Sequence, residues 1–337
     1  MSAKHKLPVT IVTGFLGSGK TTLLQHALRQ QGMQDTAVLV NEFGMVGLDH
    51  HLLQMVEEST ILLGGGCVCC STRDDLVQAL TQLLNRVQKG ERDVSKVVIE
   101  TTGLADPAPI VFTVLSHPVL QHHFHIQNVI VTVDAVNGLF HLRRQPESVK
   151  QALVADKFII TKTDLAPGEE VKQLLRELQV INPSAGRHTA VHGVIDAALL
   201  FSPAVTIRQR AADPAPVFQE KGTHVQDVNS VSITFREPLD WTAFGLWLSM
   251  LLHAKGEDIM RVKGLLDIGG AGPVILNGVQ HIIHPPNHLE AWPSEERVST
   301  LVFIMRSVSP EEILTSLEAF QKAFDVKHNM PEMEILQ

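Results

Sequence analysis

Short apolar runs recur along the first 195 residues, and each is followed by a loop or by a segment with helical spacing. The runs are rich in Val, Ile and Leu and alternate little; they cover residues 9–13, 37–40, 60–63, 97–99, 129–133 and 158–160. Strands with this pattern are buried on both faces, as in a parallel sheet with helices on either side. We therefore predict a doubly wound α/β domain with a mostly parallel sheet.

The pattern changes after residue 200. A stretch containing Pro203, Pro214 and Pro216 has the composition of a linker. Beyond it, strand-like and helix-like segments follow at residues 230–235, 241–253, 261–268, 274–283, 301–306 and 309–324. We predict an α/β domain over residues 1–200, a linker over 201–227, a smaller α+β domain of order βαβββα over 228–326, and a tail over 327–337.

Composition narrows the class of protein. Of the 337 residues, 44% are hydrophobic and 19% are charged, which is typical of a globular chain long enough for two domains. The net charge of −8 argues against a nucleic-acid partner. No apolar run approaches the length of about 20 residues that a membrane span needs, and the N-terminus lacks an export core. The clustered cysteines indicate a reducing compartment, so we expect a soluble, cytoplasmic protein.

The segment from Gly14 to Thr21 fits the phosphate-loop pattern G-x-x-x-x-G-K-[ST], between an apolar strand and a helical pattern. Glycines in such a loop let successive backbone N–H groups surround a phosphate. We expect Lys20 to reach the β and γ phosphates and Thr21 to bind Mg²⁺. The residues predicted to hold the phosphates are Gly14, Gly17, Ser18, Gly19, Lys20, Thr21 and Thr22. A dinucleotide site is the weaker alternative, because its fingerprint lacks the Lys-Thr pair.

Residues 161–164, Thr-Lys-Thr-Asp, follow the last apolar run of the α/β domain. A carboxylate here can accept hydrogen bonds from the N1–H and the 2-amino group of guanine, which adenine does not offer in that arrangement. The usual motif begins with Asn, and Thr161 lacks that side-chain amide. An ordinary strand-end turn is the alternative. Together with the phosphate loop, Lys162 and Asp164 favour a site for GTP and GDP.

The chain resembles the CobW-like family of P-loop GTPases, proteins connected with metal-cofactor delivery. The resemblance is carried by Gly14 to Thr22, Asn41-Glu42-Phe43-Gly44, Gly66-Cys67-Val68-Cys69-Cys70, and Glu100 to Pro107, and it extends over a C-terminal domain from about Val228 to Phe324. It implies that Glu100 and Gly103 sense the γ phosphate and Mg²⁺. Lys20, Thr21 and Glu100 are then the expected catalytic residues.

Cys67, Cys69 and Cys70 place three thiols within four residues, after three glycines that allow a tight turn. Thiolates favour Zn²⁺ or Cu(I) over Mg²⁺ or Ca²⁺. Tetrahedral zinc needs a fourth ligand, for which Glu42, His117, water and a client protein are candidates. Redox chemistry and inert buried thiols are the alternatives. His122, His123 and His125 lie near His117, but only His117 is supported by the resemblance; the others are more typical of a solvated edge.

These patterns lead to one hypothesis: a GTPase that carries zinc on the cysteine loop and passes it to an apo-metalloprotein. Segments 41–49 and 100–107 would respond to the γ phosphate. Delivery of cobalt or iron is an alternative from the same family, and a nonenzymatic zinc buffer that only senses GTP is an alternative from another class. The sequence leaves open the client, the physiological metal and whether the chain forms a homo-oligomer.

Overall fold

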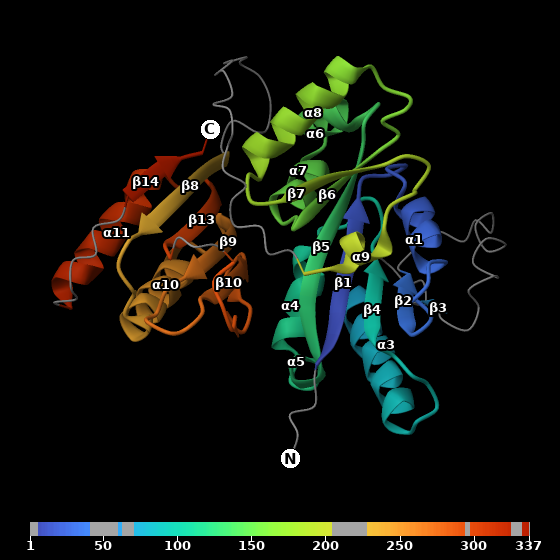
Figure 1. Ribbon diagram of the computed structural model, residues 1–337, viewed down its shortest axis with the longest axis horizontal. Helices are drawn as coiled ribbons and strands as arrows, with labels where there is room; N and C mark the ends of the chain where they lie inside the picture. Colours follow the sequence, from blue (N-terminus) through green and yellow to red (C-terminus); the bar gives the residue numbers. More distant parts are fainter. Residues whose placement is uncertain are drawn as a thin grey trace. The chain divides into compact units, whose positions relative to one another are not determined.

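A computed structural model of the chain describes residues 6–40, 60–62, 71–203, 228–293, 297–324 and 332–336 (Figure 1). The described residues divide into two compact units. The first holds most of the residues up to 203. The second holds those from 228 onward, and residues 152–154 and 175–185 group with it.

The first unit is built on a parallel sheet with the strand order β3-β2-β4-β1-β5-β6-β7 in the described part of the chain. Its strands are β1 (Leu7–Gly14), β2 (Thr36–Val40), β3 (Thr60–Leu62), β4 (Lys96–Glu100), β5 (Phe124–Asp134), β6 (Lys157–Thr161) and β7 (Gly186–Ala190). This arrangement confirms the predicted α/β fold. The strand β7 was not predicted, because its sequence Gly-Arg-His-Thr-Ala has no apolar run; its place at the sheet edge comes from parallel pairing with β6.

Helices cover both faces of this sheet (Figure 1). The helices between residues 20 and 201 are α1 (Lys20–Leu28), α3 (Ser71–Gln88), α4 (Ala108–Ser116), α5 (Leu120–His123), α6 (Gly138–Arg144), α7 (Pro146–Leu153), α8 (Gly168–Ile181) and α9 (Ala197–Phe201); the ends of α7 and α8 fall in the ranges that group with the second unit. On one face, α1 and α9 pack on β1, β2, β4, β5 and β6 through a core that includes Leu23, Ile130 and Leu200. The helices α3, α4 and α5 pack together, and α4 and α5 contact β5. Loops follow the carboxyl ends of β1, β4, β5 and β6.

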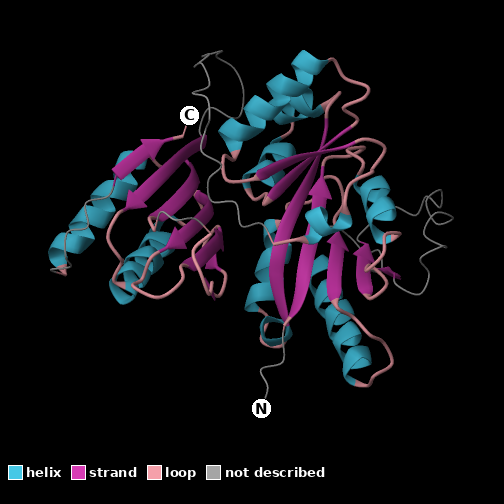
Figure 2. Cartoon of the chain, in the orientation of Figure 1, coloured by secondary structure: helices cyan, strands magenta, loops and turns pink. Residues whose placement is uncertain are grey.

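The second unit contains an antiparallel sheet of order β11-β10-β9-β13-β8-β14, with β12 beside β10 (Figure 2). Its elements are β8 (Val228–Phe235), α10 (Trp241–Lys255), β9 (Ile259–Leu266), β10 (Val274–Val279), β11 (Ile282–Ile283), β12 (Asn287–His288), β13 (Ser299–Arg306), α11 (Pro310–Ala323) and β14 (Glu332–Ile335). Both helices share one apolar core with the sheet. Each helix begins at a polar cap, Asp240 for α10 and Ser309 for α11.

The second unit differs from its prediction in its shorter strands, among them β12, which was not predicted. Residues 274–283 were predicted as one strand, but they form a hairpin of β10 and β11 that turns at Gln280, whose φ of 52° is left-handed. Residues 332–335, assigned to a tail, form β14 and pair with β8, with Met333 opposite Ile233. The alternation Glu-Met-Glu-Ile suits an edge strand. Among the described helices, none combines the length and apolar composition that crossing a membrane requires.

Candidate functional site

The phosphate loop connects β1 to α1, where the sequence motif predicted it. Gly14, Gly17 and Gly19 have φ values of 142°, 71° and 89°, which favour glycine. A Cβ at Gly14 would also lie 2.8 Å from Ser18 Oγ and still closer to Thr132 on β5. The hydroxyls of Ser18 and Thr132 are hydrogen-bonded at 2.6 Å, which ties the loop to the neighbouring strand. The phosphate loop is thus fixed against β5.

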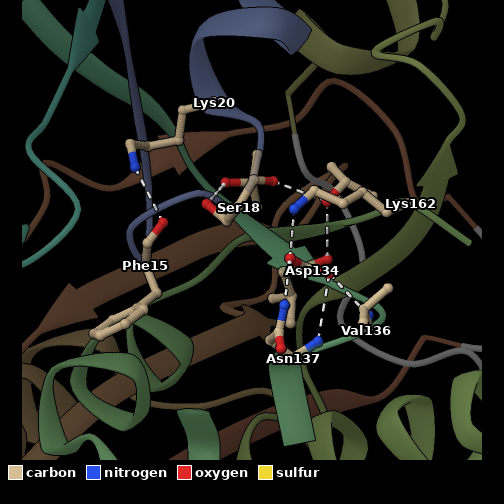
Figure 3. A network of polar contacts seen from close by, with 10 residues as sticks. Phe15, Ser18, Lys20, Asp134, Val136, Asn137 and Lys162 are labelled. Carbon is tan, nitrogen blue, oxygen red and sulfur yellow. Dashed lines mark hydrogen bonds and ion pairs between the residues drawn. The ribbon is translucent and has the colours of Figure 1, made fainter. Parts of the chain in front are cut away.

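Lys20 begins α1 and points its ammonium group into this loop (Figure 3). Nζ donates to the carbonyl oxygens of Gly14 at 2.8 Å and Phe15 at 3.2 Å. Burial lowers the pKa of Lys20, and the carboxylate of Glu100 acts in the opposite direction. A partly desolvated cation at a glycine-rich turn that opens a helix is the arrangement that binds phosphate oxygens. The residues present therefore fit the phosphates of a nucleotide.

Thr21 and Glu100 are brought together although 79 positions separate them in sequence. Thr21 Oγ1 donates to Glu100 Oε1 at 2.7 Å. Glu100 ends β4 and pairs with Val12 of β1, so the parallel register places its carboxylate beside the phosphate loop. Hydroxyl and carboxylate oxygens suit Mg²⁺, which prefers hard oxygen ligands. This pair fits a magnesium ion next to a bound triphosphate.

The segment after Glu100 packs closely on the phosphate loop. A Cβ at Gly103 would lie 2.6 Å from the backbone nitrogen of Leu16, so this contact leaves no room for a side chain. Gln151 on α7 donates from Nε2 to the carbonyl oxygens of Gly103 at 3.2 Å and Ala105 at 3.0 Å. Asp106 accepts from the N–H of Ala108, at the start of α4. Gln151 was not predicted from the sequence, because no local sequence pattern links it to Gly103.

The predicted base-reading residues follow β6 at the same edge of the sheet. Thr161 donates from Oγ1 to the carbonyl oxygen of Ser18 at 2.8 Å, so its hydroxyl supports the phosphate loop directly. Lys162 has a left-handed φ of 56°, and so does His192 after β7, at 51°. Nε2 of His192 lies 3.6 Å from Oδ2 of Asp164, whose side chain is 28% exposed. Backbone strain of this kind often marks binding sites.

Asp134, at the end of β5, was not among the predicted site residues. Its Oδ2 accepts from Lys162 Nζ at 2.6 Å, and its Oδ1 accepts from the N–H of Val136 at 2.8 Å (Figure 3). Burial would raise the pKa of Asp134, but the hydrogen bonds from Lys162, Val136 and Asn137 bring it below its usual value. An aspartate at the end of an apolar strand, with Asn137-Gly138 three residues further on, is a signal that sequence reasoning could have used.

The predicted metal ligands lie mostly outside the described residues: Cys67, Cys69, Cys70 and Glu42. His117 is described and follows α4, where its Nδ1 accepts from the N–H groups of Val119 at 3.3 Å and Leu120 at 3.5 Å. Within the described ranges, no three His, Cys, Asp or Glu side chains come close enough to hold a metal ion. The zinc ligands therefore stay predictions, whereas the nucleotide residues meet at one edge of the sheet.

The comparisons with known proteins cover almost the whole chain. The model of the CobW/HypB/UreG nucleotide-binding domain matches residues 8–188, and that of the cobalamin synthesis protein cobW C-terminal domain matches residues 228–321. The zinc chaperone YjiA of Escherichia coli is 34% identical over 94% of this chain and 100% of its own length. The zinc-regulated GTPase metalloprotein activator 1 of Schizosaccharomyces pombe is 28% identical over 93% of this chain and 83% of its own length.

A solved structure agrees with these matches. The crystal structure of the zinc-bound YjiA GTPase from E. coli superimposes with a TM-score of 0.67 and 30% identity, over 94% of this chain and 99% of that one. The nucleotide-binding model alone spans more than half of the chain, and its range contains the phosphate loop, the Thr21–Glu100 pair and the predicted base-reading turn at residues 161–164. The protein therefore belongs to the CobW/HypB/UreG family of nucleotide-binding proteins.

Proposed function

We propose that the protein is a GTP-hydrolysing zinc metallochaperone, which carries zinc on Cys67, Cys69 and Cys70 and transfers it to a client apo-metalloprotein in the cytoplasm. One observation carries the proposal. In the parallel sheet, Val40 of β2 pairs with both Glu100 of β4 and Leu62 of β3. The chain therefore leaves β2 just before Asn41–Gly44, and β3 just before the cysteines, at the edge where the nucleotide residues meet.

The nucleotide half rests on the contacts of the described residues. Lys20 holds the β and γ phosphates, and its charge offsets the negative charge that grows on them during hydrolysis. Thr21 and Glu100 hold Mg²⁺, which, when bound, would neutralise the same oxygens. Asp164 reads guanine, and Gly103 follows the γ phosphate because it already packs on Leu16 of the phosphate loop. The names of the matched relatives, a GTPase and zinc chaperones, agree with this assignment.

The zinc half rests on thiolate chemistry and on the position of the cysteines in the chain. Three thiolates without a fixed fourth ligand make an open site, and an open site can exchange its metal, whereas a closed structural site holds it. Glu42, His117, water or a ligand from the client completes the tetrahedron. Zinc is the cargo here, and hydrolysis of GTP is the event that changes its affinity.

Zinc titration of the purified full-length chain in a reducing buffer tests the proposal. Parallel titrations contain a nonhydrolysable GTP analogue, GDP or no nucleotide. Because segment 41–44 lies between the γ phosphate and the cysteines in this proposal, zinc affinity should differ between the two nucleotides by about 5- to 150-fold, the range of typical couplings. Proton release should accompany zinc binding, since thiols must deprotonate to coordinate.

Two variants locate the effect. Replacing Cys67, Cys69 and Cys70 with Ser should remove high-affinity zinc binding and leave GDP affinity unchanged. Glu42→Ala should reduce the dependence of zinc affinity on nucleotide. Equal zinc affinity with GDP and the GTP analogue would contradict a nucleotide-controlled carrier, and tighter nucleotide-dependent binding of cobalt or iron than of zinc would change the cargo. Zinc binding with no GTP turnover, even with a client present, would indicate a buffer or sensor.

A further inference from the structure

The ion pair between Asp134 and Lys162 joins two neighbouring strands at the base site. Asp134 is the last residue of β5, and its backbone pairs with Thr161, the last residue of β6 and the neighbour of Lys162. The Nζ to Oδ2 distance is 2.6 Å. The Asp134 side chain is only 3% exposed, whereas that of Lys162 is 37% exposed. The pair thus links a buried anchor to a cation at the surface of the site.

The carboxylate of Asp134 is fixed by the turn that follows it. Oδ1 accepts from the backbone N–H of Val136 at 2.8 Å, and Oδ2 accepts from the Asn137 side-chain amide at 3.2 Å (Figure 3). These bonds come from residues 134–137, which lead directly into α6. A carboxylate with bonds to both oxygens has little freedom to turn. Its orientation is therefore decided before any ligand arrives.

The ion pair with Asp134 restricts the conformation of the Lys162 side chain. Lysine has a flexible four-carbon side chain, and ordering such a side chain on binding costs affinity. The left-handed backbone at Lys162 sets the direction in which the side chain leaves β6, and Asp134 fixes where it ends. With both ends held, the stem of Lys162 can serve as a preset wall of the proposed base site, two residues before Asp164, which in that proposal reads the edge of the base. Preorganisation of this kind reduces the entropy lost when a ligand binds.

We propose that Asp134 is a positioning residue for guanine nucleotides, which acts through Lys162 and does not itself contact the base. This inference rests on the proposed base site at Lys162 and Asp164. Because Asp134 orients a wall and leaves the edge of the base to Asp164, its loss should weaken binding of any nucleotide whose base enters the site. Guanosine and inosine nucleotides, which differ by the 2-amino group, should be affected equally.

Asp134→Asn in the full-length chain tests the proposal. Asparagine has the same shape and keeps an oxygen for the N–H of Val136, but it loses the charge that pairs with Lys162. We expect the Kd of GDP and of IDP to rise about tenfold, a loss of about 1.4 kcal/mol. The KM for GTP should rise with a smaller change in kcat. Asp156→Asn is the matched control. Asp156 lies directly before β6 and is as buried as Asp134, but its Oδ2 accepts from the N–H of Val129.

A double-mutant cycle separates positioning from a merely structural role. In a Lys162→Met background, Asp134→Asn should change the Kd of GDP by less than about twofold, because no ammonium remains to orient. A tenfold loss in both backgrounds would show that Asp134 acts through the fold and would overturn the proposal. So would a tenfold loss in the Asp156→Asn control.

Asp164→Ala distinguishes failure of this inference from failure of the base site. It should weaken GDP more than IDP, because only guanine offers the 2-amino group. If Asp164→Ala behaves in this way but Asp134→Asn leaves GDP affinity unchanged, the base site stands and the positioning role is wrong. If Asp164→Ala affects neither nucleotide, the base is read elsewhere, and both assignments fall together.

Discussion

In the nucleotide-binding unit, buried polar side chains gather at the carboxyl ends of parallel strands, whereas in the C-terminal unit two helices cover an antiparallel sheet with an apolar layer. Lys20, Glu100, Asp134 and Thr161 are all buried in the first unit, and each has a hydrogen-bond partner close to the phosphate loop or the base-reading turn. In the second unit, Trp247 and Phe303 pack edge to face, with their ring centroids 6.2 Å apart.

This difference between the two units indicates that the residues for binding and the residues for apolar packing lie in different parts of the chain. Strand ends in a parallel sheet bring polar groups together from distant parts of the chain, and these groups form few of the contacts that bury apolar area. The apolar layer of the C-terminal unit does the reverse. Substitutions should therefore change nucleotide affinity in one unit and folding free energy in the other.

The largest effect is expected in the apolar layer. Trp247 is 2% exposed, and its Nε1 donates to Ser316 Oγ at 3.1 Å. Trp247→Ala should destabilise the C-terminal unit by about 3–5 kcal/mol, because it leaves a cavity between α10 and the sheet. Chemical denaturation of the full-length chain, followed by circular dichroism, measures this loss. Leu246→Ala, on the same helix but 47% exposed, should stay within about 0.5 kcal/mol of the parent protein.

If Trp247→Ala weakened GDP binding, the assignment of affinity to one unit and of folding free energy to the other would be wrong. We expect the Kd of GDP to remain within about twofold of the parent value at temperatures where the C-terminal unit stays folded, since the variant's cavity lies in a separate core. A loss beyond tenfold would mean that the apolar layer also supports the nucleotide site.

A somewhat smaller effect is expected for Lys20→Ala. Losing the cation should weaken GTP by roughly a hundredfold or more, because a hydrogen bond to a charged group contributes about 1.5–3 kcal/mol and Lys20 can form more than one. Titration with a fluorescent GTP analogue measures the change. Lys96→Ala is the control, since Lys96 begins β4 at the opposite end of the strand from Glu100. Similar losses for both variants would contradict the assignment of the phosphate loop.

Asp164→Asn should change which base is preferred. The amide that replaces the carboxylate would present a donor to the donors of guanine, so GTP should weaken by about ten- to a hundredfold, the cost of an unpaired buried group. ATP should change little. Competition titrations with GTP and ATP measure both. Equal losses for the two nucleotides would remove the argument for guanine and leave a phosphate site of open base preference.

The smallest effect is expected in the C-terminal unit, at the cap of α11. Ser309 caps α11 by accepting from the N–H of Glu312, while the Glu312 carboxylate accepts from the N–H of Ser309. Ser309→Ala should cost about 0.5–2 kcal/mol, the usual value of such a cap. Thermal unfolding detects it as a small shift of the second unit alone. A larger loss than that of Trp247→Ala would reverse the comparison between capping and packing.

Sequence reasoning predicts the residues whose chemistry is local. The phosphate loop could be predicted because its glycines, Lys20 and Thr21 lie within one strand-to-helix turn. The base-reading turn was predicted for the same reason, and the structure adds that Thr161 bonds Ser18. Gln151 was missed because its partner Gly103 lies 48 positions away and no local pattern connects the two. Asp134 was missed although its turn is local, because its pairing with Lys162, 28 positions away, depends on the order of the strands.

The sequence by itself determined the α/β class of the first unit, the phosphate-loop motif and the family, because apolar periodicity and a short motif need only neighbouring residues. Only the tertiary structure decided that Glu100 meets Thr21, that β7 joins the sheet edge and that residues 332–335 pair with β8. These contacts depend on strand order and register, which place residues side by side regardless of their distance along the chain. A local sequence pattern does not determine which strands pair, because the same strand could pair with several others.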